Sequence, residues 1–279
     1  NAIRACVIEL ENNVILEAYC DEEYGGGNGA LGASLRHRPD AIINMDGGNY
    51  EIWSCSLGGQ ILKMDVRANT PQDSSALVVD ALLTVREELA PFIHNRHDEL
   101  EKDRYYAGTD MSRSAFRFYE FSAGKGDLGC NLELGTLSFV FYTNKSREEI
   151  AKELSVIETK ILSRFKQLNV HADGFEPLSR FFHYLSVPDD DETLKITKKS
   201  AEDAAGREVR ISGSCLTDLS LFLKYGSPHS INFGLVRDFA LYGGAHQPDE
   251  FVEQQALLEH CKALALVLIR WCGAHKSKK

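Results

Sequence analysis

The sequence predicts an α/β fold, a mixed and mostly parallel sheet with helices, interrupted by an inserted α+β domain. Two patterns predict it. Near the start of the chain, a β-prone run, a glycine-rich loop, a short helix and a second β-prone run follow one another, which is the order of a βαβ unit and of a parallel sheet. Further along, strands alternate between apolar and polar residues, as in an antiparallel sheet with one solvated face. The chain has 279 residues, enough for two domains of roughly 150 residues each.

The first elements come from the start of the chain. Residues 14–19 (VILEAY) are apolar and β-prone and end at Asp-Glu-Glu and a glycine cluster, which predicts a strand that leaves the sheet through a tight loop. Residues 30–38 indicate a short helix, which Pro39 ends. Residues 41–45 (AIINM) predict a second strand, which ends at Asp46-Gly47-Gly48.

The pattern changes after Gly58-Gly59, where apolar and charged residues begin to alternate. Ser146 and Glu149 form a capping box ahead of an amphipathic helix. The expected elements are a strand at 62–66, a helix at 74–89, strands at 116–121 and 137–141, and a helix at 150–165. The order β-α-β-β-α over residues 59–165 is most of a ferredoxin-like domain.

The remainder returns to an α/β pattern. It contains a loop rich in aspartate at 188–191, which we expect to be solvated, and a long helix at 249–271 with an apolar second half. The other expected elements are a strand that ends at Val170, helices at 178–185 and 216–225, and strands at 209–211 and 231–233. The first domain would therefore be discontinuous, with residues 1–58 and 166–279, and residues 59–165 would be the insertion.

The composition excludes some partners. The formal charge is −10, from 41 acidic and 31 basic side chains, which argues against nucleic acid or an anionic membrane because phosphate binding depends on basic patches. The longest clean apolar run, residues 263–269, is far below the roughly 18–20 residues of a membrane span, and no signal peptide is recognisable at the start. Seven scattered cysteines without a C-x-x-C pair favour a cytoplasmic location.

Four acidic or histidine side chains lie where an α/β sheet places its ligands, near the carboxyl ends of strands. Glu22 and Glu23 follow the first predicted strand, Asp46 follows the second, and His246 lies in a glycine loop before the long helix. Carboxylates together with a neutral imidazole suit zinc, cobalt or manganese. Each signal alone has an ordinary alternative, because an Asp-Glu-Glu is commonly a solvated turn and a loop histidine is commonly structural.

Longer stretches, taken in order, resemble one family. They are CDEEYGGGNGAL at 20–31, NMDG at 44–47, Gly58-Gly59, SCLTD at 214–218 followed by GSP and NFG, and GGAHQPDEFV at 243–252. Together they resemble the zinc-dependent acetylornithine deacetylase, succinyl-diaminopimelate desuccinylase and glutamate carboxypeptidase family of metallopeptidases. The resemblance spans nearly the whole chain. It implies that the discontinuous domain is a phosphorylase/hydrolase-like catalytic domain and that the insertion is a lid and dimerisation domain.

The resemblance also implies roles for single residues. Glu22 would be the general base, which takes a proton from the attacking, metal-activated water and returns it to the leaving nitrogen. Glu23 and His246 would bind one of two divalent metal ions, and Asp46 would bind the other. Zinc is the expected metal, with cobalt or manganese as alternatives. The reaction would be hydrolysis of an amide bond.

Further implications concern the substrate and the partner. The substrate would be an N-acyl amino acid or a short peptide. Asn131 in the lid, the glycine loop at Gly244, and Asn69, which stands where the family has a histidine, would contact it. The protein would be a homodimer joined through the inserted domain.

The sequence departs from the family pattern in the other half of the metal site. The family has an H-x-D motif and a metal-bridging aspartate before its Asp-Glu-Glu, whereas residues 1–20 contain neither histidine nor aspartate. His171-Ala172-Asp173 resembles the motif but follows the Asp-Glu-Glu, so a strand that re-enters the first domain is the interpretation we favour. An arginine expected near strand 137–141 is also missing, with Tyr142 and Thr143 in its neighbourhood.

Two kinds of function therefore stay open. The first is an active metal-dependent amidohydrolase, of which this chain is the whole or a fragment. The second is a catalytically incomplete homologue of the same fold that acts as a binding or assembly protein. An H-x-D and a further aspartate upstream of Asn1 would favour the enzyme.

Overall fold

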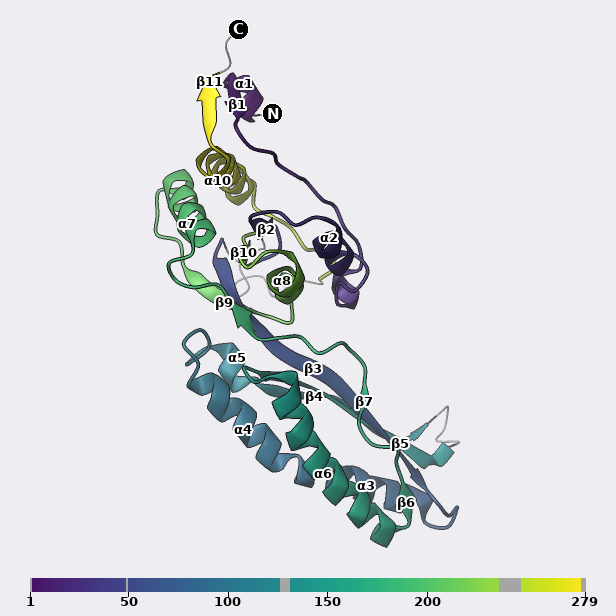
Figure 1. The fold of residues 1–279 in the computed structure, drawn as a ribbon. Coiled ribbons are helices and arrows are strands. Elements are labelled where there is room, and N and C mark those ends of the chain that lie inside the picture. Colours follow the sequence, from purple (N-terminus) through teal and green to yellow (C-terminus); the bar gives the residue numbers. More distant parts are fainter. Residues whose placement is uncertain (1, 49, 126–130, 236–246, 277–279) are drawn as a thin grey trace. The chain divides into compact units, whose positions relative to one another are not determined.

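A computed structural model describes residues 2–48, 50–125, 131–235 and 247–276 (Figure 1). The chain divides into two compact units. Unit 1 consists of Asn1–Ser56 and Leu185–Lys279, and unit 2 consists of Leu57–Tyr184. The long strand β3 (Ile52–Ala68) gives its first residues to unit 1 and the rest to unit 2.

The sheet of unit 1 is mixed. β2 (Ile42–Asn44) pairs in parallel with β10 (Ser230–Asn232), and β10 pairs antiparallel with the start of β3. β8 (Leu185–Ser186) and β9 (Ile211–Cys215) also pair with β3. The predicted α/β fold with a mixed sheet is thus confirmed, but the expectation that the sheet is mostly parallel is wrong, because β10 and β8 both pair antiparallel with β3. Its parallel pair joins two strands that lie far apart in the sequence.

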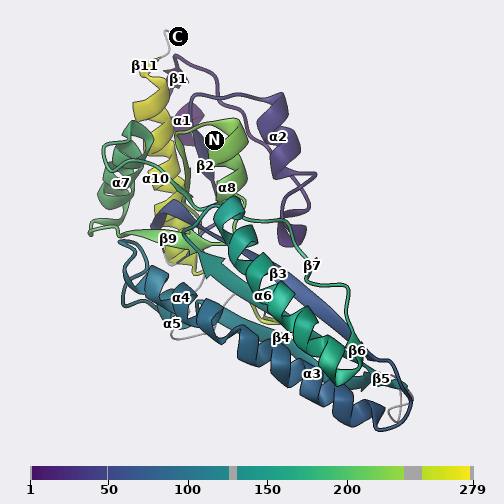
Figure 2. The ribbon, with the colours of Figure 1, turned by 60° about the horizontal axis from the view of Figure 1, so that its bottom comes forward.

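Helices cover the apolar side chains of this sheet. α7 (Glu192–Ala205) packs on α10 (Gln254–Cys272), and α2 (Ala30–Arg36) packs on the short turns α8 (Leu219–Leu221) and η3 (Phe222–Gly226) (Figures 1 and 2). The core contains Ile52, Leu194, Ile231, Phe233 and Ala263. β1 (Ile8–Leu10) and β11 (Ala274–Lys276) form a separate two-stranded antiparallel sheet. The remaining elements are α1 (Ala2–Ala5) and η1 (Glu22–Tyr24).

Residues 14–19 form no strand, so the predicted first strand, and the βαβ unit built on it, are wrong. Val14, Ile15 and Leu16 expose 47%, 56% and 82% of their surface. β-prone side chains make a strand only where a neighbouring strand pairs with the backbone. Among the described strands none pairs with this segment.

The helix predicted at 178–185 is also absent. The amide of Leu178 donates to the carbonyl of Ile61, and the amide of Phe182 donates to the carbonyl of Gly59. The backbone of this segment thus bonds to β3, and those amides are not available for the i to i−4 bonds of a helix.

The acidic loop at 188–191 was expected to be solvated, but Asp191 is buried. Its side chain accepts a hydrogen bond from the amide of Leu194 and caps α7, a helix that the sequence pattern did not predict. Gly206 ends α7 in the left-handed conformation. The predicted helix at 216–225 is the pair of short turns α8 and η3, and the helix predicted at 249–271 begins only at Gln254.

Unit 2 is an antiparallel sheet with helices on one face (Figures 1 and 2). β3 pairs with β5 (Asn131–Thr143), and β5 pairs with β4 (Phe116–Lys125). The short strands β6 (Val170–His171) and β7 (Glu176–Pro177) pair with β3. The helices are α3 (Ser74–Glu88), α4 (Ala90–Glu101), α5 (Asp110–Arg113) and α6 (Arg147–Leu168).

The core of unit 2 lies between this sheet and its helices, with Met64, Leu82, Phe92, Phe139 and Phe165 among its buried residues. The capping box of Ser146 and Glu149 is present as predicted. Two helices that the sequence pattern did not predict, α4 and α5, stand between α3 and β4. The observed order is therefore β-α-α-α-β-β-α.

The boundaries of the units differ from the expected ones at 58/59 and 165/166. The second boundary lies between Tyr184 and Leu185, because β6 and β7 pair with the part of β3 that belongs to unit 2. The roles of a catalytic domain and a lid stay predictions for the two units. In the described parts of the chain, no helix combines the length and the apolar composition needed to cross a bilayer.

Candidate metal and catalytic site

Glu22 and Glu23 lie on η1, a single tight turn in unit 1. Asp21 before it and Gly25 after it both have left-handed backbones. The side chain of Asp21 accepts a hydrogen bond from the amide of Asn28, and its carbonyl accepts one from Gly26. This loop presents Glu22 half-buried and Glu23 exposed.

Gly26 lets this loop pack against the start of α8. A Cβ at Gly26 would lie 2.0 Å from Oδ1 of Asp218, and its φ of +68° is a conformation that favours glycine. Asp218 is 1% exposed. The glycine-rich loop therefore brings the turn with the two glutamates next to a buried carboxylate.

Asp46 follows β2 and lies half-buried in the same unit. Burial raises the pKa of its carboxyl group above the ordinary value, a backbone hydrogen bond at Gly47 opposes this, and the negative charge of Glu23 raises it further. The negative charge of Glu23 therefore acts on the carboxyl group of Asp46.

Tyr19 lies among the same acidic groups. Burial raises the pKa of its phenol, and the charges of Asp218, Glu22 and Asp46 raise it further. Its ring packs edge-on against Phe222, with centroids 5.8 Å apart. The negative charges of three carboxylates thus act on this one half-buried phenol.

The acidic groups around Tyr19 and Asp46 are of the chemical type that binds a cation. All the charges that shift the pKa values of Tyr19 and Asp46 are negative, and carboxylates that repel one another in a half-buried site are stabilised by a divalent ion. Within the described residues, however, no group of three or more histidine, cysteine or acidic side chains is arranged to hold a metal. The predicted fourth member, His246, lies outside the described residues, as does Gly244.

The two predicted asparagines belong to unit 2. Asn69 follows β3, is exposed, and donates from its side chain to the side chain of Asn169 at 3.4 Å. Asn131 is the first residue of β5. Since β3 and β5 are antiparallel, with Arg67 opposite Leu134, both asparagines lie at the same end of this sheet.

Two other expectations also concern unit 2. His171 and Asp173 lie 3.2 Å apart and are both exposed, at the short strand β6. The arginine expected near strand 137–141 is absent there, and on the neighbouring strand β4 Arg117 donates to the hydroxyl of Tyr142 at 2.5 Å. Only the pairing of β4 with β5 reveals this neighbour.

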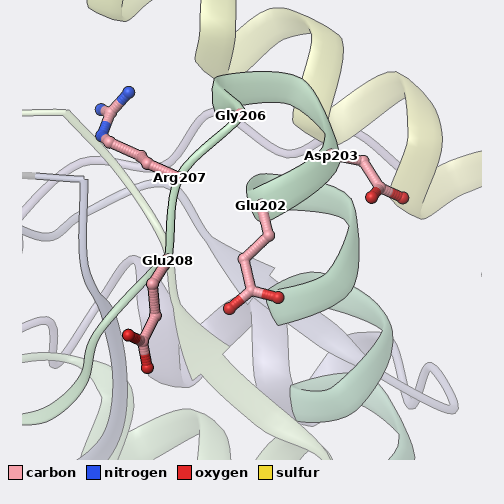
Figure 3. Close-up of a pocket in the computed structure, with 5 residues that line it drawn as sticks. All are labelled: Glu202, Asp203, Gly206, Arg207 and Glu208. Atoms are coloured by element: carbon pink, nitrogen blue, oxygen red, sulfur yellow. The ribbon is translucent and has the colours of Figure 1, made fainter.

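A pocket of about 380 Å³ lies elsewhere in unit 1, at the end of α7 (Figure 3). Asp203 points toward α10, where Arg270 binds it, and it also pairs with Lys199. Arg207 pairs with Glu259. None of the predicted site residues lines this pocket. Its lining residues are Glu202, Asp203, Gly206, Arg207 and Glu208.

The fold defines an α/β protein in which Asp46 follows a strand of the mixed sheet and Glu22 and Glu23 lie on a tight turn. The chain belongs to the peptidase family M20/M25/M40, whose family model matches residues 1–270. Among curated proteins, none matches this chain.

Solved structures share the fold. A tripeptidase from Staphylococcus aureus has 16% identity and a TM-score of 0.59, over 91% of this chain and 62% of its own. An aminopeptidase from Bacillus cereus has 16% identity and a TM-score of 0.56, over 90% and 63%. An M20 family metallo-carboxypeptidase from Sulfolobus solfataricus has 15% identity and a TM-score of 0.54, over 89% and 69%. The chain thus spans less than two thirds of the length of the first two.

Proposed function

We propose that the protein is a metal-dependent hydrolase that cleaves an amide bond in a short peptide or an N-acyl amino acid. The observation that carries the proposal is the match of residues 1–270 to the M20/M25/M40 peptidase family, and the acidic surroundings of Tyr19 and Asp46 in unit 1 support it. The similar structures are a tripeptidase, an aminopeptidase and a metallo-carboxypeptidase by name, which favours a small amide substrate.

Glu23 and His246 would hold one divalent ion and Asp46 the other, with zinc as the expected metal and cobalt or manganese as alternatives. When bound, such ions lower the pKa of water and polarise an amide carbonyl. In the proposed reaction, water adds to the amide carbon, the C–N bond breaks, and a carboxylic acid and an amine form.

Glu22 would move the proton in this reaction. It accepts a proton from the attacking water and delivers it to the leaving nitrogen, which departs as an amine. Its half-buried place on a tight turn supports this role, because a base must be held in position and partly shielded from water.

The finer proposals follow the resemblance to acetylornithine deacetylase, succinyl-diaminopimelate desuccinylase and glutamate carboxypeptidase. Unit 2 would be a ferredoxin-like lid and the dimer interface, and Asn69, Asn131 and Gly244 would contact the substrate. The enzyme would work in the cytoplasm. These proposals concern the whole protein, since this chain spans only part of its structural relatives.

A second function stays open. Residues 1–20 contain no histidine and no aspartate, although the resemblance implies further metal ligands before the Asp-Glu-Glu. A homologue with an incomplete site would act as a binding or assembly protein.

A metal-restoration screen separates the two functions. The protein is stripped with a chelator, zinc, cobalt or manganese is added, and amine release is measured from di- and tripeptides and from acetyl-, succinyl- and formyl-amino acids. We expect turnover that depends on the added metal. Tight binding of these compounds without turnover under any metal would favour the binding protein instead.

A further inference from the structure

Four side chains of unit 1 form one line of hydrogen bonds that ends on Asp46. The hydroxyl of Tyr19 donates to Oδ1 of Asn44 at 3.0 Å. Nδ2 of Asn44 donates to Oδ1 of Asn232 at 3.2 Å, and Nδ2 of Asn232 donates to Oδ2 of Asp46 at 3.3 Å. We call these residues the asparagine relay.

Strand register brings the two asparagines together. Asn44 and Asn232 are direct partners in the parallel pair of β2 and β10. They are 8% and 0% exposed. A buried amide that lacks hydrogen bonds costs about 1–3 kcal/mol, so each of these side chains must have partners, and each finds them inside the relay.

Gly234 allows the relay to reach Asp46. A Cβ at Gly234 would lie 2.4 Å from the carbonyl oxygen of Met45 and 2.8 Å from the carbonyl carbon of Asp46. The chain after β10 therefore passes directly against the chain after β2. This close approach keeps the side chain of Asn232 beside the carboxylate.

The direction of the relay follows from its last member. A carboxylate only accepts hydrogen bonds, so the nitrogen of Asn232 must face Asp46 and its oxygen must face Asn44. The nitrogen of Asn44 then faces Asn232, and its oxygen faces the hydroxyl of Tyr19. Every donor in the relay thus points toward Asp46. The last hydrogen bond holds Oδ2 of Asp46 in place, and the other lone pairs of the carboxylate can bind a ligand.

We propose that Asn232, held by Asn44 and Tyr19, is a positioning residue that orients the Asp46 carboxylate toward a divalent ion. This inference rests on the proposed function, in which Asp46 is a metal ligand. Partners that orient a ligating side chain commonly contribute about 10- to 100-fold to metal affinity. The relay gives Asp46 such a partner from a strand 186 residues away.

The test compares Asn232→Leu with the wild-type protein. Leucine keeps the size of the side chain but neither donates nor accepts. Metal affinity is measured by competition with a chromophoric chelator for Zn²⁺, and the visible spectrum of the Co²⁺-loaded protein reports the ligand geometry. We expect a loss of about 10- to 100-fold in Zn²⁺ affinity and an altered Co²⁺ spectrum.

Tyr50→Phe is the matched control. It removes another buried hydrogen bond of unit 1, from the Tyr50 hydroxyl to the carbonyl of Ala201 at 3.2 Å, and should leave both readouts unchanged. Tyr19→Phe is the milder variant if Asn232→Leu does not fold. It keeps the ring on Phe222 and removes only the first donor, so it should weaken Zn²⁺ binding less but in the same direction.

Wild-type Zn²⁺ affinity and an unchanged Co²⁺ spectrum in folded Asn232→Leu, or in Tyr19→Phe if that variant has to be used, would overturn the positioning role. The proposed function would then still stand. A wild-type protein that binds no divalent ion would instead overturn the proposed function, and the positioning role with it.

Discussion

Nδ1 of His229 lies 2.6 Å from Oδ2 of Asp191, whose other oxygen accepts the amide of Leu194 at the start of α7. One buried carboxylate thus caps a helix and holds a histidine that precedes β10. It joins two parts of unit 1 that the sequence separates.

Asp191→Ala should lower the free energy of unfolding by about 1–3 kcal/mol, because a helix cap is worth typically about 1 kcal/mol and the His229 partner is lost as well. Asp190 is exposed and next in sequence, so Asp190→Ala should stay within about 0.5 kcal/mol of the wild type. Urea denaturation measures both. Equal stabilities of the two variants would show that Asp191 has no special role.

Gly26→Ala should destabilise the protein, since its Cβ would collide with Asp218 at 2.0 Å and its φ is +68°. We expect a loss of about 1–3 kcal/mol or more. Gly32 lies inside α2, and apart from its chain neighbours and the backbone of its own helix no described atom lies within 4 Å of the place that a Cβ would take there, so Gly32→Ala should gain about 0.5–1 kcal/mol. Thermal unfolding of both variants checks this, and a stable Gly26→Ala variant would contradict the packing of the loop on α8.

His260 should make stability depend on pH. Burial lowers the pKa of its imidazole, against a smaller opposing effect of the hydrogen bond to the carbonyl of Phe233 at 2.9 Å. Below about pH 6.5 the unfolded chain binds a proton at this histidine that the folded protein does not, so stability falls as the pH falls. His260→Gln should flatten this dependence in denaturation curves between pH 7.5 and 5.5, chosen as about one unit on either side of that value.

His94→Gln is the control for this prediction, because the His94 side chain is 74% exposed. It should leave the pH dependence as it is in the wild type. A His260→Gln variant with an equally steep loss of stability would refute the assignment.

Arg96 should be essential to unit 2. Its side chain is fully buried and donates to Glu99 at 2.5 Å and to Glu153 at 2.8 Å. Arg96→Ala removes the buried cation of this cluster and leaves Lys145, which lies 2.8 Å from Glu99 and 2.6 Å from Glu153, so we expect a cost of about 1–3 kcal/mol. Arg86→Ala, on the exposed face of α3, should cost less than about 0.5 kcal/mol. Guanidinium denaturation distinguishes the two, and a similar small loss in both would contradict a buried ion cluster.

The sequence predicts those elements whose signals are local. α6 follows its capping box and α3 follows its apolar periodicity, because helices depend on residues three or four positions apart. Residues 14–19 and 178–185 show the limit. The backbone of residues 178–185 bonds to β3, and that of residues 14–19 pairs with no described strand. Both outcomes depend on segments that are distant in sequence, which the local composition does not reveal.

The same limit applies to the candidate site. Asp46 could be named from its place after a predicted strand that is present, as β2, whereas Glu22 and Glu23 could be named from the family resemblance alone, since the strand predicted before them is absent. Tyr19 and the link from Asn44 to Asn232 could not, because they depend on the register of β2 against β10 and on the close approach at Gly234.

The most direct test of the account is the turnover of Glu22→Gln, measured together with its metal content by elemental analysis. Glu17→Gln, five residues earlier and exposed, is the control and should behave as the wild type. Loss of a general base lowers kcat by about 100- to 10,000-fold, so Glu22→Gln should lose turnover by that factor while it keeps its metal. Wild-type turnover in metal-loaded Glu22→Gln would contradict the proposed mechanism.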